Sequence, residues 1–241
     1  MRAPDMLDPM ADIPVLTQRL TDAFDMARDV HNGDAIKGTH LPYLLHVLDV
    51  CSVALRHGAD EDQAIAALLH DVVEDGGGAP VLDEIRQRFG DRVAEIVLAC
   101  SDSQEADPAN KPDWWVRKIR YIDHLHTMSS DAALVSGADK LSNVRSIVAD
   151  YETHGEDFFS VFKTGRAGTL WYYRRIAEIL PSRLADTEAA HRIGDLLQST
   201  VSELVEAVGP AAATDWRNGR AEEQAHRMTL PNNIGTQADP S

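Results

Sequence analysis

The sequence lacks the features that mark secreted and membrane proteins. It has only two cysteines in 241 residues, Cys51 and Cys100, and neither has CxxC or Cys/His ligand spacing. Both lie in apolar, helix-like stretches, which predicts core residues in a reducing compartment. The N-terminal segment has no apolar run, which argues against a secretory signal, and no stretch approaches the ~20 apolar residues of a membrane span. We therefore expect a cytoplasmic protein without membrane contact.

Positive charge is also scarce. The chain has 23 Lys and Arg against 39 Asp and Glu, which gives a formal net charge of -16. The electrostatic field of such a negative charge repels polyphosphate backbones, so nucleic acid is not expected as a partner. A few local lysines, arginines or a metal ion could still hold a small anionic ligand. Hydrophobic content of 44% and charged content of 26% are ordinary for a globular domain.

Alternating β patterns are absent as well, whereas helical periodicity recurs along the chain. The sequence thus predicts an all-α protein, a single helical bundle of about nine or ten helices over residues 12–208. Residues 209–241 change to a polar composition and are expected to form a flexible C-terminal tail. The expected helices cover residues 16–30, 41–57, 60–75, 81–89, 91–102, 113–127, 130–151, 155–163, 166–180 and 187–208.

The octapeptide LLHDVVED, residues 68–75, places four ionisable groups beside an apolar run. On one helix, His70 and Glu74 are four residues apart, as are Asp71 and Asp75, so all four share one broad face. Acids at a helix C-terminus are disfavoured by the macrodipole. The octapeptide is therefore either a solvated acidic helix end or part of a site for a divalent cation, to which imidazole and carboxylate ligands are suited.

Two further residues extend this pattern. His46 lies in an apolar helical stretch, where a hydrogen-bonded core histidine is the simpler interpretation, and Asp139 precedes Lys140, which could form a buried ion pair with it. Taken together with His70 and Asp71, they form a set of four N and O ligands that leaves positions open for water and a phosphate. This set predicts a metal centre.

The set resembles the HD superfamily of metal-dependent phosphohydrolases. AALLHDVVED (66–75), LDEIRQRFGDRVAEIV (82–97) and ADKLSNVR (138–145) are similar to the hydrolase domain of Rel/SpoT proteins and small alarmone hydrolases, over residues 16–180. The resemblance implies an HD-domain bundle in which Mn²⁺ is held by His46, His70, Asp71 and Asp139. It also implies that Glu74 and Asp75 position and deprotonate the attacking water, with Asn143 near the nucleotide. The implied reaction removes the 3′-diphosphate of a (p)ppGpp-like alarmone as pyrophosphate.

The loop before His46 departs from the family pattern. It reads NGDAIKGTHLPY and carries only one basic residue, Lys37, where family members have an Arg-Lys stretch. Other candidates for binding the substrate are Lys140 and Arg145, and Lys118 could also face an anion. The substrate thus stays open between a guanosine or adenosine alarmone and another nucleotide or phosphoester. A catalytically silent nucleotide-binding module is a further alternative, and the oligomeric state is not predicted.

Overall fold

The computed structural model describes residues 13–105, 107 and 109–230. Over these residues the chain forms eleven α-helices and two 3-10 helices, and its only β pairing is an isolated bridge between Ala35 and Pro42. The predicted all-α class is confirmed, with slightly more α-helices than expected. None of the helices in this part of the chain is long and apolar enough to cross a membrane.

Most helices lie where the periodicity predicts them, with ends shifted by a few residues. In chain order they are α1 (Gln18–His31), α2 (Leu44–Arg56), α3 (Glu61–Leu69), α4 (Val72–Gly76), α5 (Ala79–Phe89), α6 (Asp91–Cys100), α7 (Trp114–Leu125), α8 (Ser130–His154), the 3-10 helix η1 (Gly155–Val161), α9 (Gly165–Ile179), the 3-10 helix η2 (Leu180–Arg183), α10 (Glu188–Val208) and α11 (Ala211–Thr229).

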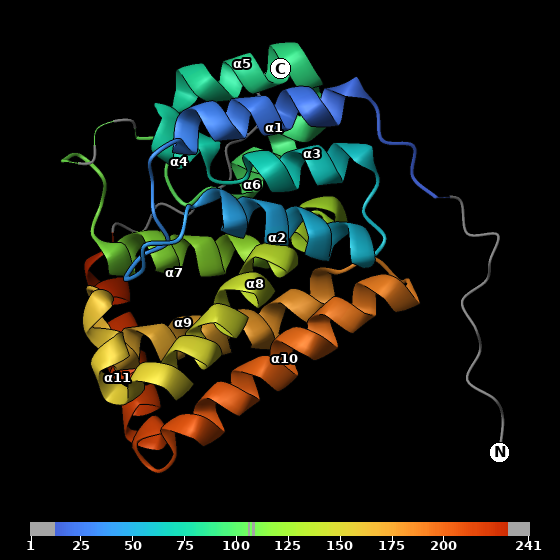
Figure 1. The fold of residues 1–241 in the computed structure, drawn as a ribbon. Coiled ribbons are helices and arrows are strands. Elements are labelled where there is room, and N and C mark those ends of the chain that lie inside the picture. The colour runs from blue at the N-terminus through green and yellow to red at the C-terminus, as the bar shows by residue number, and fades with distance from the viewer. Residues whose placement is uncertain (1–12, 106, 108, 231–241) are drawn as a thin grey trace, which may run out of the picture.

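The helices are stacked in successive layers, with α5 and α1 at one end of the molecule and α10 at the other (Figure 1). The long helix α8 lies between them and packs against α2, α3, α6 and α10. Every residue from Ala132 to Ser142 in α8 is buried, because other helices surround this stretch. A polar side chain on this stretch is therefore held in the interior and needs a partner there.

The predicted continuous helix over residues 60–75 is wrong. Its start is as expected, since Asp60 and Gln63 form a capping box. The chain then turns at His70 and Asp71, so that α3 ends at Leu69 and α4 begins at Val72. The acidic residues of the octapeptide therefore lie at the start of α4 rather than at the end of a long helix.

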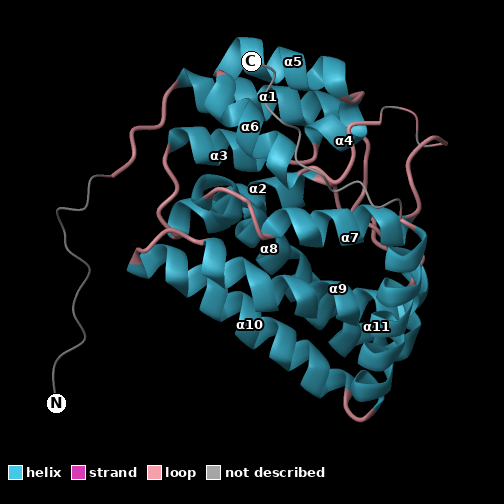
Figure 2. Cartoon of the chain, turned by 180° about the vertical axis from the view of Figure 1, so that it is seen from behind, coloured by secondary structure: helices cyan, strands magenta, loops and turns pink. Residues whose placement is uncertain are grey.

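The flexible tail expected over residues 209–241 is also wrong for residues 211–229, which form α11. This helix packs against α9 and α7, and Figure 2 shows it running beside α9 towards α7. Its buried positions are Ala212, Asp215, Gly219 and Glu223. These positions have helical spacing, but most are not apolar, so hydrophobic periodicity could not reveal the helix. Residues 231–241 lie outside the described residues.

Candidate active site

Two histidines and two aspartates meet between α2, α8 and the turn that joins α3 to α4. His46 lies in the first turn of α2, and Asp139 lies in the middle of α8. The Nε2 atoms of His46 and His70 are 3.3 Å apart, and Asp139 Oδ1 lies 3.3 Å from the first and 3.7 Å from the second. Asp71 Oδ2 lies 2.9 Å from His70 Nε2 and 3.9 Å from His46 Nε2. The structure thus brings the four predicted ligands together.

The separations among His46, His70 and Asp139 fit one divalent cation. Ligand atoms about 2.1 Å from a common ion lie about 3.0 Å apart at right angles and about 4.2 Å apart when opposite. The ring of His70 is oriented for this role, because its Nδ1–H donates to the Ala67 carbonyl oxygen at 2.9 Å. The lone pair of Nε2 therefore faces the other ligands. His46, His70 and Asp139 form a compact cluster that could hold a metal ion.

Neighbouring side chains hold the carboxylate ligands in place. The Tyr43 hydroxyl donates to Asp71, and the Asn143 side-chain amide donates to Asp139 Oδ1. Lys140 forms an ion pair with the second oxygen of Asp139. Burial would raise the pKa of Asp139, but Lys140 and the histidines outweigh burial and hold that pKa well below its usual range. Asp139 is therefore ionised at neutral pH, as a metal ligand must be.

The electrostatics of His70 show that positive charge is favoured at this point. Burial lowers the pKa of His70, but Asp71 and Asp139 outweigh burial and raise the pKa to about 9. The two carboxylates thus attract a positive charge to the centre of the set. A divalent cation supplies that charge in place of the proton and leaves the imidazole free to coordinate.

The structure separates the predicted pair Glu74 and Asp75. Glu74 lines a cavity of about 240 Å³ beside the metal ligands, and it accepts a hydrogen bond of 2.6 Å from the backbone N–H of Asp102. Burial, followed by the charges of Asp102 and Asp71, raises the pKa of Glu74 to about 7. Asp75 is exposed and does not line this cavity. Of the two acids, Glu74 is therefore the one that lines the cavity beside the metal set.

The cavity beside the metal ligands is lined by Lys37, Lys118 and Lys140, and we call it the lysine cavity. Lys140 lies under the rings of Tyr121 and Tyr172, with its Nζ atom 5.0 Å and 5.8 Å from their centroids. Lys118 Nζ lies 4.9 Å from the centroid of Tyr172. The carboxylates of Asp71, Glu74, Asp102 and Asp139 also line this cavity, and Lys118 and Lys140 are ion-paired with the last two of them.

A second cavity of about 270 Å³ adjoins the lysine cavity and shares Lys37, Asn143, Phe162 and Tyr173 with it. Its remaining lining includes aliphatic and aromatic side chains, among them Ile36, Leu41, Ile147 and Phe158. We call it the apolar cavity. Lys37 stands at the boundary, with its Nζ atom 5.4 Å from the centroid of Phe162. The two cavities together could hold a ligand with an anionic part and a less polar part.

Arg145 does not lie at this site. Asp139 and Asn143 are four residues apart on α8 and face the same side, whereas Arg145 is two residues further and projects elsewhere. It lines a separate surface hollow with Arg56 and Arg192. Lys37, Lys140 and Asn143 are thus brought to the cavities, and Arg145 is not.

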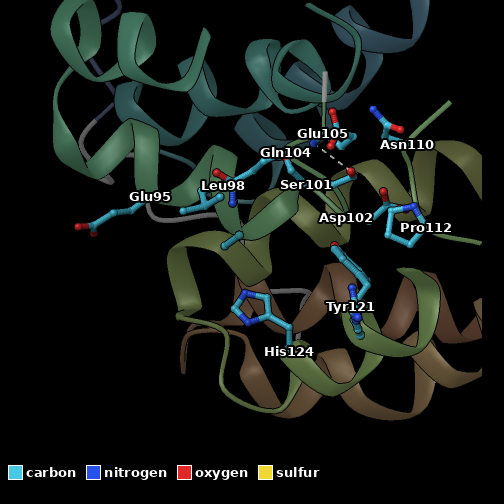
Figure 3. A pocket seen from close by; sticks show the side chains of 13 residues that line it. Glu95, Leu98, Ser101, Asp102, Gln104, Glu105, Asn110, Pro112, Tyr121 and His124 are labelled. Carbon is cyan, nitrogen blue, oxygen red and sulfur yellow. Dashed lines mark hydrogen bonds between the residues drawn. The ribbon is translucent and has the colours of Figure 1, made fainter. Parts of the chain in front are cut away.

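Sequence reasoning missed Asp102, which follows the end of α6. Its carboxylate is ion-paired with Arg117 and with Lys118, at 2.6 Å for the latter, and its side chain is only 2% exposed. Asp102 and Tyr121 separate the lysine cavity from an open hollow of about 700 Å³, which Figure 3 shows. No sequence signal distinguishes this aspartate from the other acids of the loop that follows it, because its role depends on the packing of α7.

Comparison with known proteins identifies the same region. The model of the HD domain family matches residues 23–170. A guanosine-3′,5′-bis(diphosphate) 3′-pyrophosphohydrolase, MESH1 of Danio rerio, is 31% identical over 134 residues, which cover 54% of this chain and 70% of that protein. An enzyme of the same name from Haemophilus influenzae is 31% identical over 123 residues. That match covers 51% of this chain but only 18% of the relative, so the chain spans less than a fifth of its length.

Two solved structures share the fold. A crystal structure of a Listeria monocytogenes EGD-e protein has a TM-score of 0.58 and 28% identity, and it covers 66% of this chain and 97% of its own. A metazoan ortholog of SpoT that hydrolyses ppGpp has a TM-score of 0.63, with 79% of this chain and 97% of that chain covered. Its identity is 22%, so this likeness concerns the fold alone. Helix α11 lies beyond the residues that the family model matches.

Proposed function

Because this chain belongs to the HD domain family, we propose that it is a metal-dependent phosphohydrolase that removes the 3′-diphosphate of a (p)ppGpp-like alarmone. The names of its relatives support a nucleotide diphosphate as the substrate class. The base would be guanine or adenine, and the product would be pyrophosphate. We propose Mn²⁺ as the ion, since mixed imidazole and carboxylate ligands suit this metal better than they suit Ca²⁺.

The observation that carries this proposal is the position of the lysine cavity. Asp71, Glu74 and Asp139 line it together with Lys118 and Lys140, so metal ligands, a candidate base and two cations face one space. A diphosphate in this cavity would contact the cations while its scissile bond lay beside the metal ligands. The nucleoside would then extend into the apolar cavity, past Asn143 and Lys37.

Each residue has a distinct part in this mechanism. A divalent cation on the four ligands would supply Lewis-acid activation of water and neutralise phosphate charge. Glu74, with its raised pKa, accepts the proton of the attacking water. Lys118 and Lys140 hold the diphosphate and stabilise the charge that develops on it. Tyr43 keeps the carboxylate of Asp71 oriented through its hydrogen bond.

A nucleotide panel tests this proposal. The Mn²⁺-loaded protein is incubated with guanosine and adenosine 3′,5′-bis(diphosphates), nucleoside monophosphates and simple phosphoesters. We expect pyrophosphate release from the 3′-diphosphates and no release of inorganic phosphate from the monophosphates. Asp71→Ala should abolish turnover, whereas Asp83→Ala, which removes an exposed carboxylate on α5, should leave it unchanged. Activity that persists in Asp71→Ala would exclude the proposed centre.

The loop before α2 favours a second candidate, hydrolysis of a different nucleotide or phosphoester. Lys37 is the only basic side chain that this loop contributes to the two cavities, and Arg145 lies outside both. The site thus has few cations for a second diphosphate at the 5′ position. Inorganic phosphate released from monophosphates, without pyrophosphate from bis(diphosphates), would favour this candidate over the first.

A further inference from the structure

Helix α11 spans the two helices that form one wall of the lysine cavity. That wall consists of Trp114, Lys118 and Tyr121 from α7 and of Tyr172 and Tyr173 from α9. Helix α11 packs against both α7 and α9 (Figures 1 and 2). It is therefore placed to set the separation between the element that carries Lys118 and the element that carries Tyr172.

The contact between α11 and α9 is close. A Cβ atom added at Gly219 would lie 2.4 Å from Trp171 Cβ and 3.0 Å from the Ala167 carbonyl oxygen, so only glycine fits there. One turn further along, the buried carboxylate of Glu223 accepts a hydrogen bond of 2.8 Å from the Trp171 indole Nε1–H. Trp171 is fully buried and immediately precedes Tyr172. The backbone position of Tyr172 is thus tied to α11.

An arginine extends this link to α7. Arg227 Nε donates to Glu223 at 3.0 Å, and its two terminal nitrogens donate to Asp123 on α7 at 2.9 Å and 2.8 Å. A bidentate arginine–carboxylate pair fixes orientation as well as distance. We call Asp123, Arg227, Glu223 and Trp171 the C-terminal clamp. It forms a continuous chain of hydrogen bonds from α7 through α11 to α9.

Aromatic side chains connect the C-terminal clamp to the lysine cavity. The ring of Trp171 lies 6.0 Å from Trp114 and 6.3 Å from Tyr172, measured between centroids, and both of these residues line the lysine cavity. Lys118 in turn lies over the ring of Tyr172. A change in the spacing of α7 and α9 would therefore move Lys118 relative to the ring that supports it.

We propose that α11 is a positioning element, in which Arg227 and Glu223 hold the spacing of α7 and α9 and thereby place Lys118 to bind a diphosphate group. This inference rests on the proposed function, because it assigns the lysine cavity to the diphosphate of the substrate. It adds that α11, which lies outside the residues matched by the family model, is needed for binding of the diphosphate. The clamp residues act through other residues and do not touch the substrate.

The test measures binding of inorganic pyrophosphate to the Mn²⁺-loaded full chain by titration calorimetry. Arg227→Gln and Asp123→Asn each break the bond between α11 and α7, and both side chains are partly exposed, which limits any effect on folding. We expect each variant to weaken pyrophosphate binding about tenfold, or ~1.4 kcal/mol, with Mn²⁺ affinity and the thermal midpoint close to wild type. The double variant should lose no more than Arg227→Gln alone, because that substitution already removes the interaction with Asp123.

Arg217→Gln is the matched control, since Arg217 is an exposed arginine of α11 whose only side-chain hydrogen bond within the described residues is to Thr214. It should bind pyrophosphate as wild type does. Wild-type pyrophosphate affinity in Arg227→Gln and Asp123→Asn would overturn the inference, as would a parallel loss of Mn²⁺ affinity. A wild-type protein that binds pyrophosphate but hydrolyses no alarmone would overturn the proposed function and leave the clamp supported.

Discussion

At the scale of single residues, Glu74 shows how a neighbour adjusts the chemistry of the site. Burial and the charge of Asp102 raise its pKa to about 7, while the charge of Lys118 opposes them. A base must be ionised, so we expect kcat/KM to fall as the pH drops below about 7. Asp102→Asn removes a charge that raises the pKa of Glu74, while the opposing positive charge of Lys118 remains in the protein. The acidic limb of the pH profile should therefore move to lower pH.

The control for this prediction is Glu95→Gln, which removes an exposed carboxylate on the far side of the open hollow near Asp102. Its acidic limb should coincide with that of the wild type. An acidic limb that stays in place in Asp102→Asn, or moves to higher pH, would contradict the assignment of Glu74 as the base.

That His46, His70, Asp71 and Asp139 lie together could be predicted from the sequence, whereas the residues that support them could not. His46, His70, Asp71 and Asp139 are polar groups in apolar helical stretches, and such positions require partners wherever the helices pack. Asp102 offers no comparable signal, because it follows a helix end in a polar segment. Its importance arises only when α7 brings Arg117 and Lys118 against it. That contact depends on tertiary packing and not on local pattern.

At the scale of elements, α11 shows why sequence periodicity can miss a helix. Its buried face is built from small and charged side chains, and each buried acid has a specific partner: Asp215 pairs with Arg166, and Glu223 pairs with Arg220 and Arg227. Burial of this kind gives no hydrophobic stripe to recognise. The break between α3 and α4 could not be predicted for the opposite reason, because the apolar pattern of the sequence continues through the turn.

Gly219→Ala tests the close packing of this helix. At a solvent-exposed position of a helix the substitution would stabilise the protein by about 1 kcal/mol, because alanine is the better helix former. Here the added Cβ atom would collide with Trp171, so we expect a loss of about 1–3 kcal/mol in the free energy of unfolding. Denaturant unfolding measures it. Asn218→Ala, at the exposed neighbouring position, should be neutral or slightly stabilising. An equally stable Gly219→Ala would show that α11 does not pack tightly in solution.

At the scale of the whole molecule, the site joins elements that are distant in the stack. The metal ligands come from α2, from the α3–α4 turn and from α8, whereas the lysine cavity is completed by α7 and α9. The sequence motifs identify the first group, because each ligand stands in a recognisable segment. They do not identify the second group, since α7 and α9 are positioned by packing against each other and against α10 and α11.

A divalent cation held by this set would connect three separate segments, so it would also be a structural link. Mn²⁺ at about 100 times its dissociation constant should raise the free energy of unfolding by about 2.7 kcal/mol, and a chelator should reverse the gain. Thermal unfolding with and without Mn²⁺ measures the effect. Asp71→Ala removes a ligand that is only partly buried, so the variant should fold but lose most of the metal-dependent shift. Equal shifts in the wild type and in Asp71→Ala would place the stabilising ion elsewhere on this acidic protein.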